Sequence, residues 1–418
     1  MAVTLLRPGS PLDVAAIRRE FPILEPCRTG KKLVFLDSAA SSQRPQSVLN
    51  AMDRYYETSH ANVHRGAYAL AERATEALES SRRRVARFIN APSQREIIFT
   101  RNATEAINLV AHSYGRRFLH QGDVVLLSLF EHHANIVPWH QLAADHGVTV
   151  RWIPLTEEGE LDLSDLDRLL EGVKLVGISA QSNVLGTLPD VAAVAAAAHA
   201  VDAVVMVDAC QFAPHHQTDV QAMGADFVAF SAHKMLGPTG IGALWGRRAL
   251  LEAMPPFLGG GSMIETVTTT GFTAAEIPAR FEAGTPAIAE TVGFAAAIDY
   301  LETLGMDRVE AHERRLTQYA MDTLIGRYGD KIRIYGPSDP TKRGGLASFT
   351  YGDVHAHDLS QILDDRGICV RAGHHCAKPL LAHLGVAALT RASWYVHNDT
   401  DDIDELVDAL AGADDLFG

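Results

Sequence analysis

A lysine and an aspartate follow two apolar segments of the sequence, at positions where their side chains could act together. Residues 225–230 read as a buried strand, after which Ser231-Ala-His-Lys234 and Gly237-Pro-Thr-Gly240 predict a turn without helix. The apolar segment 203–207 ends in Asp208. Open α/β sheets bind ligands at the carboxyl edge of their strands. A Schiff-base amine beside a carboxylate that can keep a pyridinium nitrogen protonated predicts pyridoxal phosphate chemistry, with Lys234 as the amine. Taken alone, the same turn is also typical of a surface lysine.

Other polar residues follow predicted strands in the same way. His132 comes just after strand 124–128, where an imidazole could stack on a cofactor ring and transfer protons near neutral pH, or simply be a hydrogen-bonded loop residue. Asn183 follows strand 175–179 and could donate to a phenolic oxygen. Asn102-Ala-Thr104 joins strand 96–100 to a helix, and the free N–H groups of a helix N-terminus suit a phosphate. Plain N-capping by Asn102 or Thr104 is the alternative.

One of the four cysteines has surroundings that favour reactivity. Cys376 lies on the predicted loop 372–379, where two histidines and a lysine flank it, which favours the thiolate and access to it. Metal binding is the alternative, but one cysteine and two adjacent histidines give poor tetrahedral spacing. Cys210 and Cys369 fall in apolar segments and are expected to be inert core, and Cys27 gives no signal.

The elements that must position these residues alternate between strands and helices. Such alternation predicts a mostly parallel sheet with right-handed crossovers. The strands are expected at 124–128, 148–153, 175–179 and 203–207, and the helices at 135–146, 164–171 and 190–200. The sequence also predicts a short helix at 12–21 and a long helix at 69–88. Two further helices are predicted, one from 291 to 304 and another that ends near 327.

Two regions differ from this pattern. Residues 255–287 are rich in glycine, threonine and proline, and long irregular segments of this kind tend to be functional. After residue 305 the predicted strands become shorter, at 345–351, 368–371 and 390–396, which places a domain boundary there.

Length and charge restrict the class of protein. A chain of 418 residues and 45.3 kDa is long enough for two domains. A net charge of −14 without a long basic run argues against nucleic acid or an anionic membrane as the main partner. We therefore expect an enzyme that acts on small molecules. We expect it in the cytoplasm, because no apolar run reaches about 18 residues and the first residues lack a signal-peptide core.

Taken together, the motifs resemble the SufS-type (group II) cysteine desulfurases of the class V aminotransferase family. The motifs appear in the family's order and span residue 15 to the end: Asn-Val-His-Arg-Gly66, Arg-Asn-Ala-Thr104-Glu-Ala-Ile-Asn, Glu-His132-His-Ala-Asn-Ile-Val-Pro-Trp, Ser-Asn183-Val-Leu-Gly, Asp208-Ala-Cys-Gln211, Ser231-Ala-His233-Lys234, Arg-Phe-Glu-Ala-Gly-Thr285-Pro and Arg371-Ala-Gly-His-His-Cys376-Ala. The resemblance implies an α/β, fold-type I pyridoxal phosphate enzyme that works as a homodimer. It implies an N-terminal segment (1–24) packed on the small domain, a large domain (25–305) with a mostly parallel sheet, and a smaller α+β domain (306–418) that carries the Cys376 loop.

The resemblance also assigns roles by position. Lys234 would form the Schiff base, Asp208 would pair with the pyridine nitrogen and His132 would stack on the ring. The other implied contacts are Asn183 and Gln211 with the phenolic oxygen, Thr104, Ser231 and His233 with the phosphate, Thr285 with the phosphate of the other subunit, and Arg391, Arg371, His64 and Arg65 with the substrate. For Arg65, an ion pair at a helix start is an equal alternative. Relatives often carry Gly-Thr where this chain has Asn102-Ala103, so a side-chain contact at residue 103 is not expected.

The implied reaction converts L-cysteine to L-alanine and leaves a persulfide on Cys376, whose sulfur supplies iron–sulfur cluster assembly. Selenocysteine lyase, an aminotransferase and a scaffold that has lost catalysis are the alternatives. His357 lies in the segment Val354-His-Ala-His357-Asp358, which resembles SufS enzymes that pass sulfur to the zinc protein SufU rather than to SufE. His357 could instead cap the helix that Asp358 begins. No resident metal is expected.

Overall fold

The computed structural model describes residues 11–25, 33–64 and 66–417. Its centre is a seven-stranded sheet in which only β8 runs antiparallel to its neighbours. In spatial order the strands are β2 (Ile97–Thr100), β8 (Gly242–Gly246), β7 (Phe227–Ser231), β6 (Val204–Asp208), β5 (Val173–Ser179), β3 (Val124–Ser128) and β4 (Thr149–Ile153). The prediction of a mostly parallel sheet is therefore confirmed.

Both faces of this sheet are covered by helices. Along β6, Val205 and Val207 pack into one apolar cluster, and Met206 packs into the other. Strands that are buried on both faces are typical of parallel sheets, and they explain the continuous apolar runs in the sequence. The first cluster includes α3 (Gln46–Thr58), α4 (Ala69–Phe88), α9 (Val191–His199) and α11 (Ile288–Leu304), and the second includes α5 (Ala103–Leu109), α7 (Val137–His146) and α10 (Arg248–Ala253).

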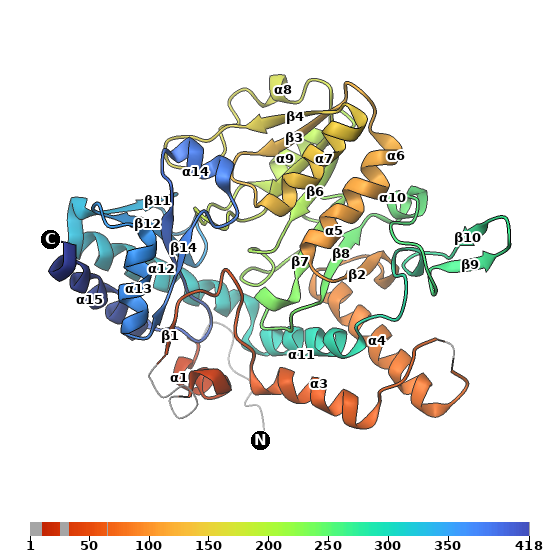
Figure 1. The fold of residues 1–418 in the computed structure, drawn as a ribbon, viewed down its shortest axis with the longest axis horizontal. Helices are drawn as coiled ribbons and strands as arrows, with labels where there is room; N and C mark the ends of the chain where they lie inside the picture. Colours follow the sequence, from red (N-terminus) through yellow and green to blue (C-terminus); the bar gives the residue numbers. More distant parts are fainter. Residues whose placement is uncertain (1–10, 26–32, 65, 418) are drawn as a thin grey trace.

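A smaller antiparallel sheet lies beside the large one, in the blue region of Figure 1. Its strand order is β11 (Ile332–Tyr335), β12 (Leu346–Tyr351), β15 (Leu389–Ser393) and β14 (Arg371–Gly373). The helices of this region are α12 (Met306–Tyr328), α13 (Ala356–Asp365), α14 (Lys378–Leu384) and α15 (Thr400–Phe417). The chain passes from α11 to α12 at Gly305, and the domain boundary near this residue stays a prediction.

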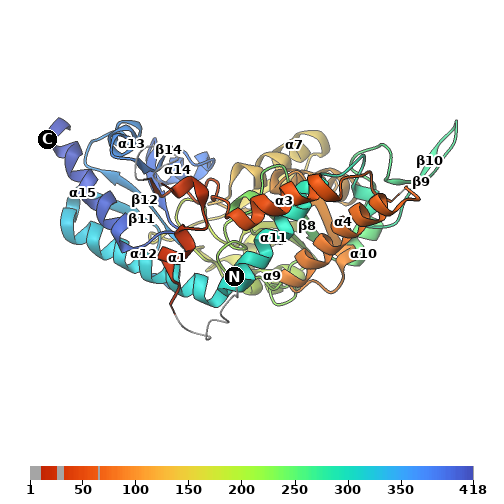
Figure 2. The same cartoon turned by 90° about the horizontal axis from the view of Figure 1, so that it is seen from below.

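The first described residues contact the last part of the chain. β1 (Val34–Phe35) pairs in parallel with β13 (Ile368–Cys369). From α1 (Val14–Arg18), Arg18 Nη1 donates to His397 O and to Asp402 Oδ2, both at 2.9 Å. These contacts connect the N-terminal segment to the region of the smaller sheet, as Figure 2 also shows for α1.

A two-stranded hairpin projects from the body of the molecule. It consists of β9 (Ile264–Val267) and β10 (Phe272–Ala274), and both views show it extending away from the large sheet (Figures 1 and 2). Val267 is 62% exposed and Phe272 is 57% exposed. The predicted irregular segment 255–287 therefore contains a hairpin that exposes two apolar side chains.

Two further details differ from the sequence-based expectations. Residues Ala232–Lys234, predicted to lack helix, form a single 3₁₀ turn, which is compatible with the glycines that follow because it ends before them. The strand β8 was not predicted. The remaining short helices are α6 (Arg116–Phe118) and α8 (Leu166–Leu169), and no helix in the described ranges is long and apolar enough to cross a membrane.

Candidate active site

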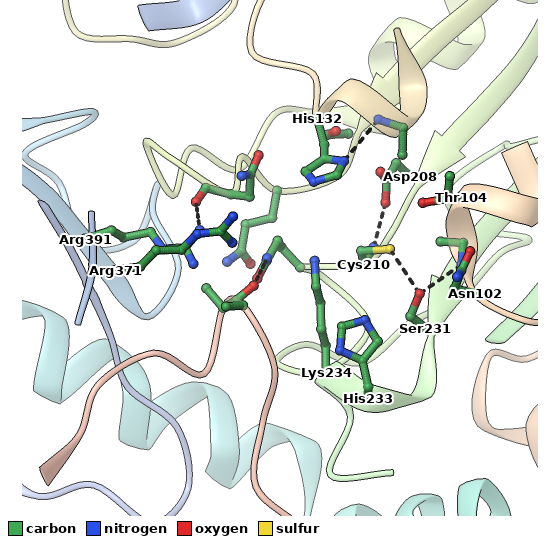
Figure 3. Close-up of a pocket in the computed structure, with 18 residues that line it drawn as sticks. Asn102, Thr104, His132, Asp208, Cys210, Ser231, His233, Lys234, Arg371 and Arg391 are labelled. Carbon is green, nitrogen blue, oxygen red and sulfur yellow. Dashed lines mark hydrogen bonds between the residues drawn. The ribbon is translucent and has the colours of Figure 1, made fainter. Parts of the chain in front are cut away.

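A cavity of about 230 Å³ opens where β5, β6 and β7 end (Figure 3). Polar residues gather there because the carboxyl ends of parallel strands meet at one edge of a sheet. Of the residues predicted from the sequence, the cavity brings together Thr104, His132, Asn183, Asp208, Gln211, Ser231, His233, Lys234, Arg371 and Arg391.

Lys234 and Asp208 face this cavity from adjacent strands. Asp208 ends β6 and is aligned with Ala229 of β7, and Lys234 ends the turn that follows β7. Asp208 is buried, and its Oδ1 accepts a hydrogen bond of 2.9 Å from Cys210 N. The half-buried Lys234 makes no hydrogen bond or ion pair within the described part of the chain, and Figure 3 shows its amine reaching into the cavity. The two groups therefore lie in one pocket with the amine free to react.

His132 is fixed as a neutral imidazole. Its Nδ1 accepts a hydrogen bond of 3.1 Å from Ala134 N, which leaves Nε2 to carry the proton. Burial and then the charge of Lys234 lower the pKa of His132 to about 3. His132 therefore offers a neutral N–H to a ligand, and its part in proton transfer stays a prediction.

The N-terminus of α5 forms one end of the cavity. Ala103 N donates to Ser231 Oγ at 2.9 Å, and Asn102 caps the helix by accepting from Glu105 N at 2.9 Å. Capping by Asn102 is therefore confirmed, and the phosphate site stays a prediction, for which the N–H of Thr104, without an acceptor within the helix, remains available. Gly242 approaches this turn so closely that a Cβ there would lie 2.8 Å from Asn102 Cα.

His233 closes the same end of the cavity. Its Nδ1 lies 3.2 Å from Ser41 Oγ. Burial and the neighbouring Lys234 lower the pKa of His233 to about 4, so this imidazole is also neutral at pH 7.

Two arginines form the opposite end. Arg391 is fully buried on β15, where its Nη1 donates to Asn183 O at 2.8 Å and its Nη2 donates to Asp37 Oδ1 at 3.3 Å. Burial lowers the pKa of Arg391 to about 10, so the guanidinium keeps its charge at pH 7. Burial also raises the pKa of Asp37, more than the nearby Arg391 and Arg371 lower it. A buried cation with a weakened counter-ion suits an anionic ligand.

Two buried polar atoms of the cavity lack partners within the described part of the chain. Gln211 Oε1 and Arg391 Nε have no hydrogen bond among the described residues, although Gln211 Nε2 donates to Ala39 O at 2.7 Å. Buried polar groups are nearly always hydrogen-bonded, so these two atoms indicate a polar ligand. The groups that line the cavity match the parts of pyridoxal phosphate and its substrate. The amine suits the aldehyde, the carboxylate suits the ring nitrogen, and the neutral imidazole suits the ring face. The helix N-terminus suits the phosphate, and the free guanidinium nitrogen suits the substrate carboxylate.

The loop that carries Cys376 lies against this cavity. Asn183 Nδ2 donates to His375 O at 2.6 Å, so in this structure the amide predicted for a phenolic oxygen holds the loop instead. Arg371 Nη2 is 3.7 Å from Cys376 Sγ. Two consecutive residues, His375 (φ 51°) and Cys376 (φ 57°), adopt the left-handed region. The predicted loop is shorter than expected, since β14 ends at Gly373 and α14 begins at Lys378.

Several residues of the predicted site do not line this cavity. Thr285 is exposed and lines a neighbouring cavity with Arg101 and Gly240, and His64 lies 3.9 Å from Glu79 beside another. Arg65 lies outside the described residues.

His357 is exposed near the start of α13. The alternative that His357 caps this helix is wrong, because α13 begins at Ala356 and His355 accepts the capping hydrogen bond from His357 N.

Three residues near the site were missed or misassigned. Cys210, expected in an inert apolar core, follows β6 and lines the cavity, where burial raises the pKa of its thiol. Asp37 has no sequence signal beyond its place after a short apolar strand. Glu131 is fully buried beneath the cavity, and the Glu-His-His sequence alone gives it the appearance of a loop residue. Cys369 is half-buried on β13, and Cys27 lies outside the described residues.

The fold and this site define a class. Solved structures superpose on nearly the whole chain: the cysteine desulfurase CsdA from Escherichia coli has a TM-score of 0.89 and 40% identity and covers 97% of this chain and 100% of its own. The cysteine desulfurase from Thermococcus onnurineus NA1 has a TM-score of 0.91 and 38% identity, with 98% and 99% covered. The fold is that of the fold-type I pyridoxal phosphate enzymes, as predicted.

The family follows from sequence. The chain belongs to the aminotransferase class-V family, whose model matches residues 34–406. A Streptomyces coelicolor protein named "Probable cysteine desulfurase" is 51% identical over 414 residues, which cover 97% of this chain and 98% of that protein. A protein of Haloferax volcanii named "Cysteine desulfurase" is 47% identical, with 97% and 98% covered.

Proposed function

We propose that this chain is a pyridoxal phosphate-dependent cysteine desulfurase that supplies sulfur for iron–sulfur cluster assembly. One observation carries the proposal: Lys234, Asp208 and Arg391 line a single cavity, and the Cys376 loop is hydrogen-bonded to Asn183 of the same cavity. An amine, a ring-nitrogen partner, a carboxylate receptor and a thiol are the groups that this reaction needs. The names of the relatives support the same activity.

Different residues around the cavity would contact different parts of the cofactor. Lys234 would hold it covalently, Asp208 would pair with its ring nitrogen and His132 would lie on its ring. Gln211 would accept a hydrogen bond from the phenolic hydroxyl through its free Oε1, and the α5 N-terminus with Ser231 and His233 would bind the phosphate. When bound, pyridoxal phosphate lowers the energy of a carbanion at the substrate Cα.

Side chains of this protein would bind the substrate, transfer its protons and take up its sulfur. Arg391 would bind the carboxylate of L-cysteine as a planar fork, and Lys234 would move the proton of the substrate Cα. Cys376 Sγ, as thiolate, would attack the substrate sulfur, so that an S–S bond forms while the C–S bond breaks. The electron pair of that bond stays with the substrate carbon, which takes up a proton, and alanine leaves. The Nε2–H of His132, which lines the same cavity, would supply a proton on the sulfur side.

The proposal is tested by assaying alanine from L-cysteine, with selenocysteine and keto acids in parallel. Alanine together with a protein-bound persulfide is the expected result, and the purified protein should be yellow. Turnover of selenocysteine alone would identify a selenocysteine lyase, transfer to keto acids would identify an aminotransferase, and a colourless protein without turnover would favour a scaffold.

A homodimer is part of the proposal. Thr285, which the resemblance places on the other subunit's phosphate, is exposed and lies outside its own chain's Lys234 cavity. The projecting hairpin exposes two apolar side chains, a feature that marks contact surfaces. A second copy that covers this hairpin would account for both observations.

The sulfur acceptor is proposed to be a SufU-type zinc protein. His357 is exposed on α13, and α13 packs against β14, whose Arg371 reaches Cys376 Sγ. An imidazole at this place could take over a ligand position on the partner's zinc and free a cysteine thiolate there. Zinc-bound thiolates are otherwise poor acceptors, because the metal withdraws their nucleophilicity.

The acceptor proposal is tested by alanine production with SufU or SufE added to wild type and to His357→Ala. We expect stimulation of wild type by SufU alone, and loss of that stimulation in His357→Ala with the basal rate kept. Equal stimulation of both proteins by SufU would contradict the proposal.

A further inference from the structure

The Cys376 loop holds a backbone shape that is unfavourable on its own. His375 and Cys376 are non-glycine residues in the left-handed region, at φ 51° and 57°. Such a conformation is unfavourable for a residue with a side chain and persists only when its surroundings hold it. The loop therefore needs restraints from outside itself.

His133 supplies two of these restraints from a distant part of the chain. Its main-chain N–H donates to Cys376 O at 2.7 Å, and its Nε2 accepts from Lys378 N at 3.0 Å. Lys378 N is the first N–H of α14, whose N-cap Ala377 has no capping side chain. The imidazole of His133 thus caps a helix that lies 245 residues further along the chain.

The turn that carries His133 is itself fixed to the floor of the large sheet. The carboxylate of Glu131 accepts from Ser179 N and Ser179 Oγ, both at 2.6 Å, and from Asn135 Nδ2 at 2.8 Å. Asn135 Oδ1 in turn accepts from Trp139 Nε1 at 2.9 Å. The anchor is fully buried, so the turn cannot move independently of β3 and β5.

Two adjacent histidines of this turn serve different parts of the site. His132 lines the Lys234 cavity, and His133 contacts the Cys376 loop instead. We propose that His133 is a positioning residue that holds the Cys376 loop, through its Nε2 and its main-chain N–H, in the shape that presents the thiol to the substrate. The inference rests on the proposed desulfurase function.

The test compares His133→Leu, His133→Gln and the control His383→Leu, which removes an exposed imidazole from the same helix α14. Gln can offer an oxygen to Lys378 N, and Leu cannot. One measurement is the rate of Cys376 alkylation by iodoacetamide in the protein without substrate, with the label located by mass spectrometry. The other is the steady-state rate of alanine formation from L-cysteine.

We expect His133→Leu to alkylate several-fold faster and to lose about tenfold in kcat, a factor that corresponds to about 1.4 kcal/mol, with KM within about twofold of wild type. His133→Gln and His383→Leu should stay within about twofold on both measurements. Unchanged alkylation in His133→Leu, or a glutamine variant as impaired as the leucine variant, would overturn the proposal. Absence of alanine formation by wild type would refute the desulfurase function, whereas the alkylation comparison would still test the role of His133.

Discussion

Lys234 is the amine nearest the buried carboxylate of Asp208 in the central cavity, since it is the one lysine among the residues that line it. We predict that Lys234→Ala yields a colourless protein that forms no alanine, because no other lysine of the described chain lines the cavity and could replace it. Absorption spectra and borohydride reduction followed by peptide mapping check this. A yellow variant with a reducible cofactor linkage would show that another lysine is the correct one.

Cys376 is predicted to act on sulfur and not on the cofactor. Its loop borders the Lys234 cavity without lining it, so Cys376→Ala should keep the visible absorbance and still bind L-cysteine. It should accumulate no persulfide, as measured by cyanolysis. With selenocysteine the loss should be smaller, because selenium can leave without a thiol to attack it. Desulfuration of L-cysteine at the native rate would mean that another nucleophile acts.

The structure brings into one cavity several polar side chains that the sequence places at the end of an apolar strand or a few residues after it. Asp208, Asn183 and Lys234 were found in this way, because strand ends of a parallel sheet converge. Cys210 was misassigned because its apolar neighbours in the sequence give no signal for the turn that follows Asp208. Asp37 was missed because its partner Arg391 is 354 residues away, a distance across which no local pattern operates.

At the scale of elements, the hairpin β9–β10 is predicted to contribute to the dimer. The double variant Val267→Ser, Phe272→Ser removes the two exposed apolar side chains of the hairpin. Burying a Val or Phe side chain is worth about 1.5–3 kcal/mol, so the dimer dissociation constant should rise at least about tenfold. Analytical ultracentrifugation over a dilution series measures this. Unchanged dissociation with an unchanged unfolding midpoint would exclude the hairpin from the interface.

The elements predicted well are those with a long or repeated pattern. The helix 69–88 and the strand 124–128 were placed with the observed bounds. The strand β8, Gly-Ala-Leu-Trp-Gly, was missed because glycines at both ends resemble the turns around them. Its antiparallel pairing with β7 and β2 decides its conformation, and pairing between distant segments leaves no local signal.

At the scale of the whole molecule, a buried histidine links the first and last parts of the chain. His397 packs edge-on against Phe21, with ring centroids 5.3 Å apart, and neither of its ring nitrogens has a hydrogen-bond partner among the described residues. Burial and the charge of Arg18 lower the pKa of His397 to about 3. Below about pH 6.5 the unfolded chain therefore binds a proton that the folded chain does not. The stability of the folded chain therefore decreases as the pH is lowered below this value.

We predict that His397→Leu stabilises the protein more at pH 5 than at pH 8. The proton linkage alone corresponds to about 2 kcal/mol at pH 5 and vanishes above the ordinary pKa of about 6.5. The loss of two unsatisfied nitrogens adds about 1 kcal/mol at either pH. Urea unfolding midpoints of wild type, His397→Leu and the exposed control His383→Leu measure the effect. An equal gain at both pH values would contradict the assignment.

The contact between Arg391 and Asp37 has a consequence for how the protein is made. A ribosome synthesises the chain from its N-terminus, so the complete central sheet can emerge while residues after 305 are still untranslated. Such a nascent chain already carries Lys234 and Asp208, but it lacks the guanidinium groups of Arg371 and Arg391 that line the same cavity. It also lacks β13, with which β1 pairs. The end of the cavity proposed to hold the cofactor is therefore translated before the end proposed to hold the substrate and before Cys376. On the proposed function, an incomplete chain would therefore lack both the receptor for the substrate carboxylate and the thiol that accepts sulfur.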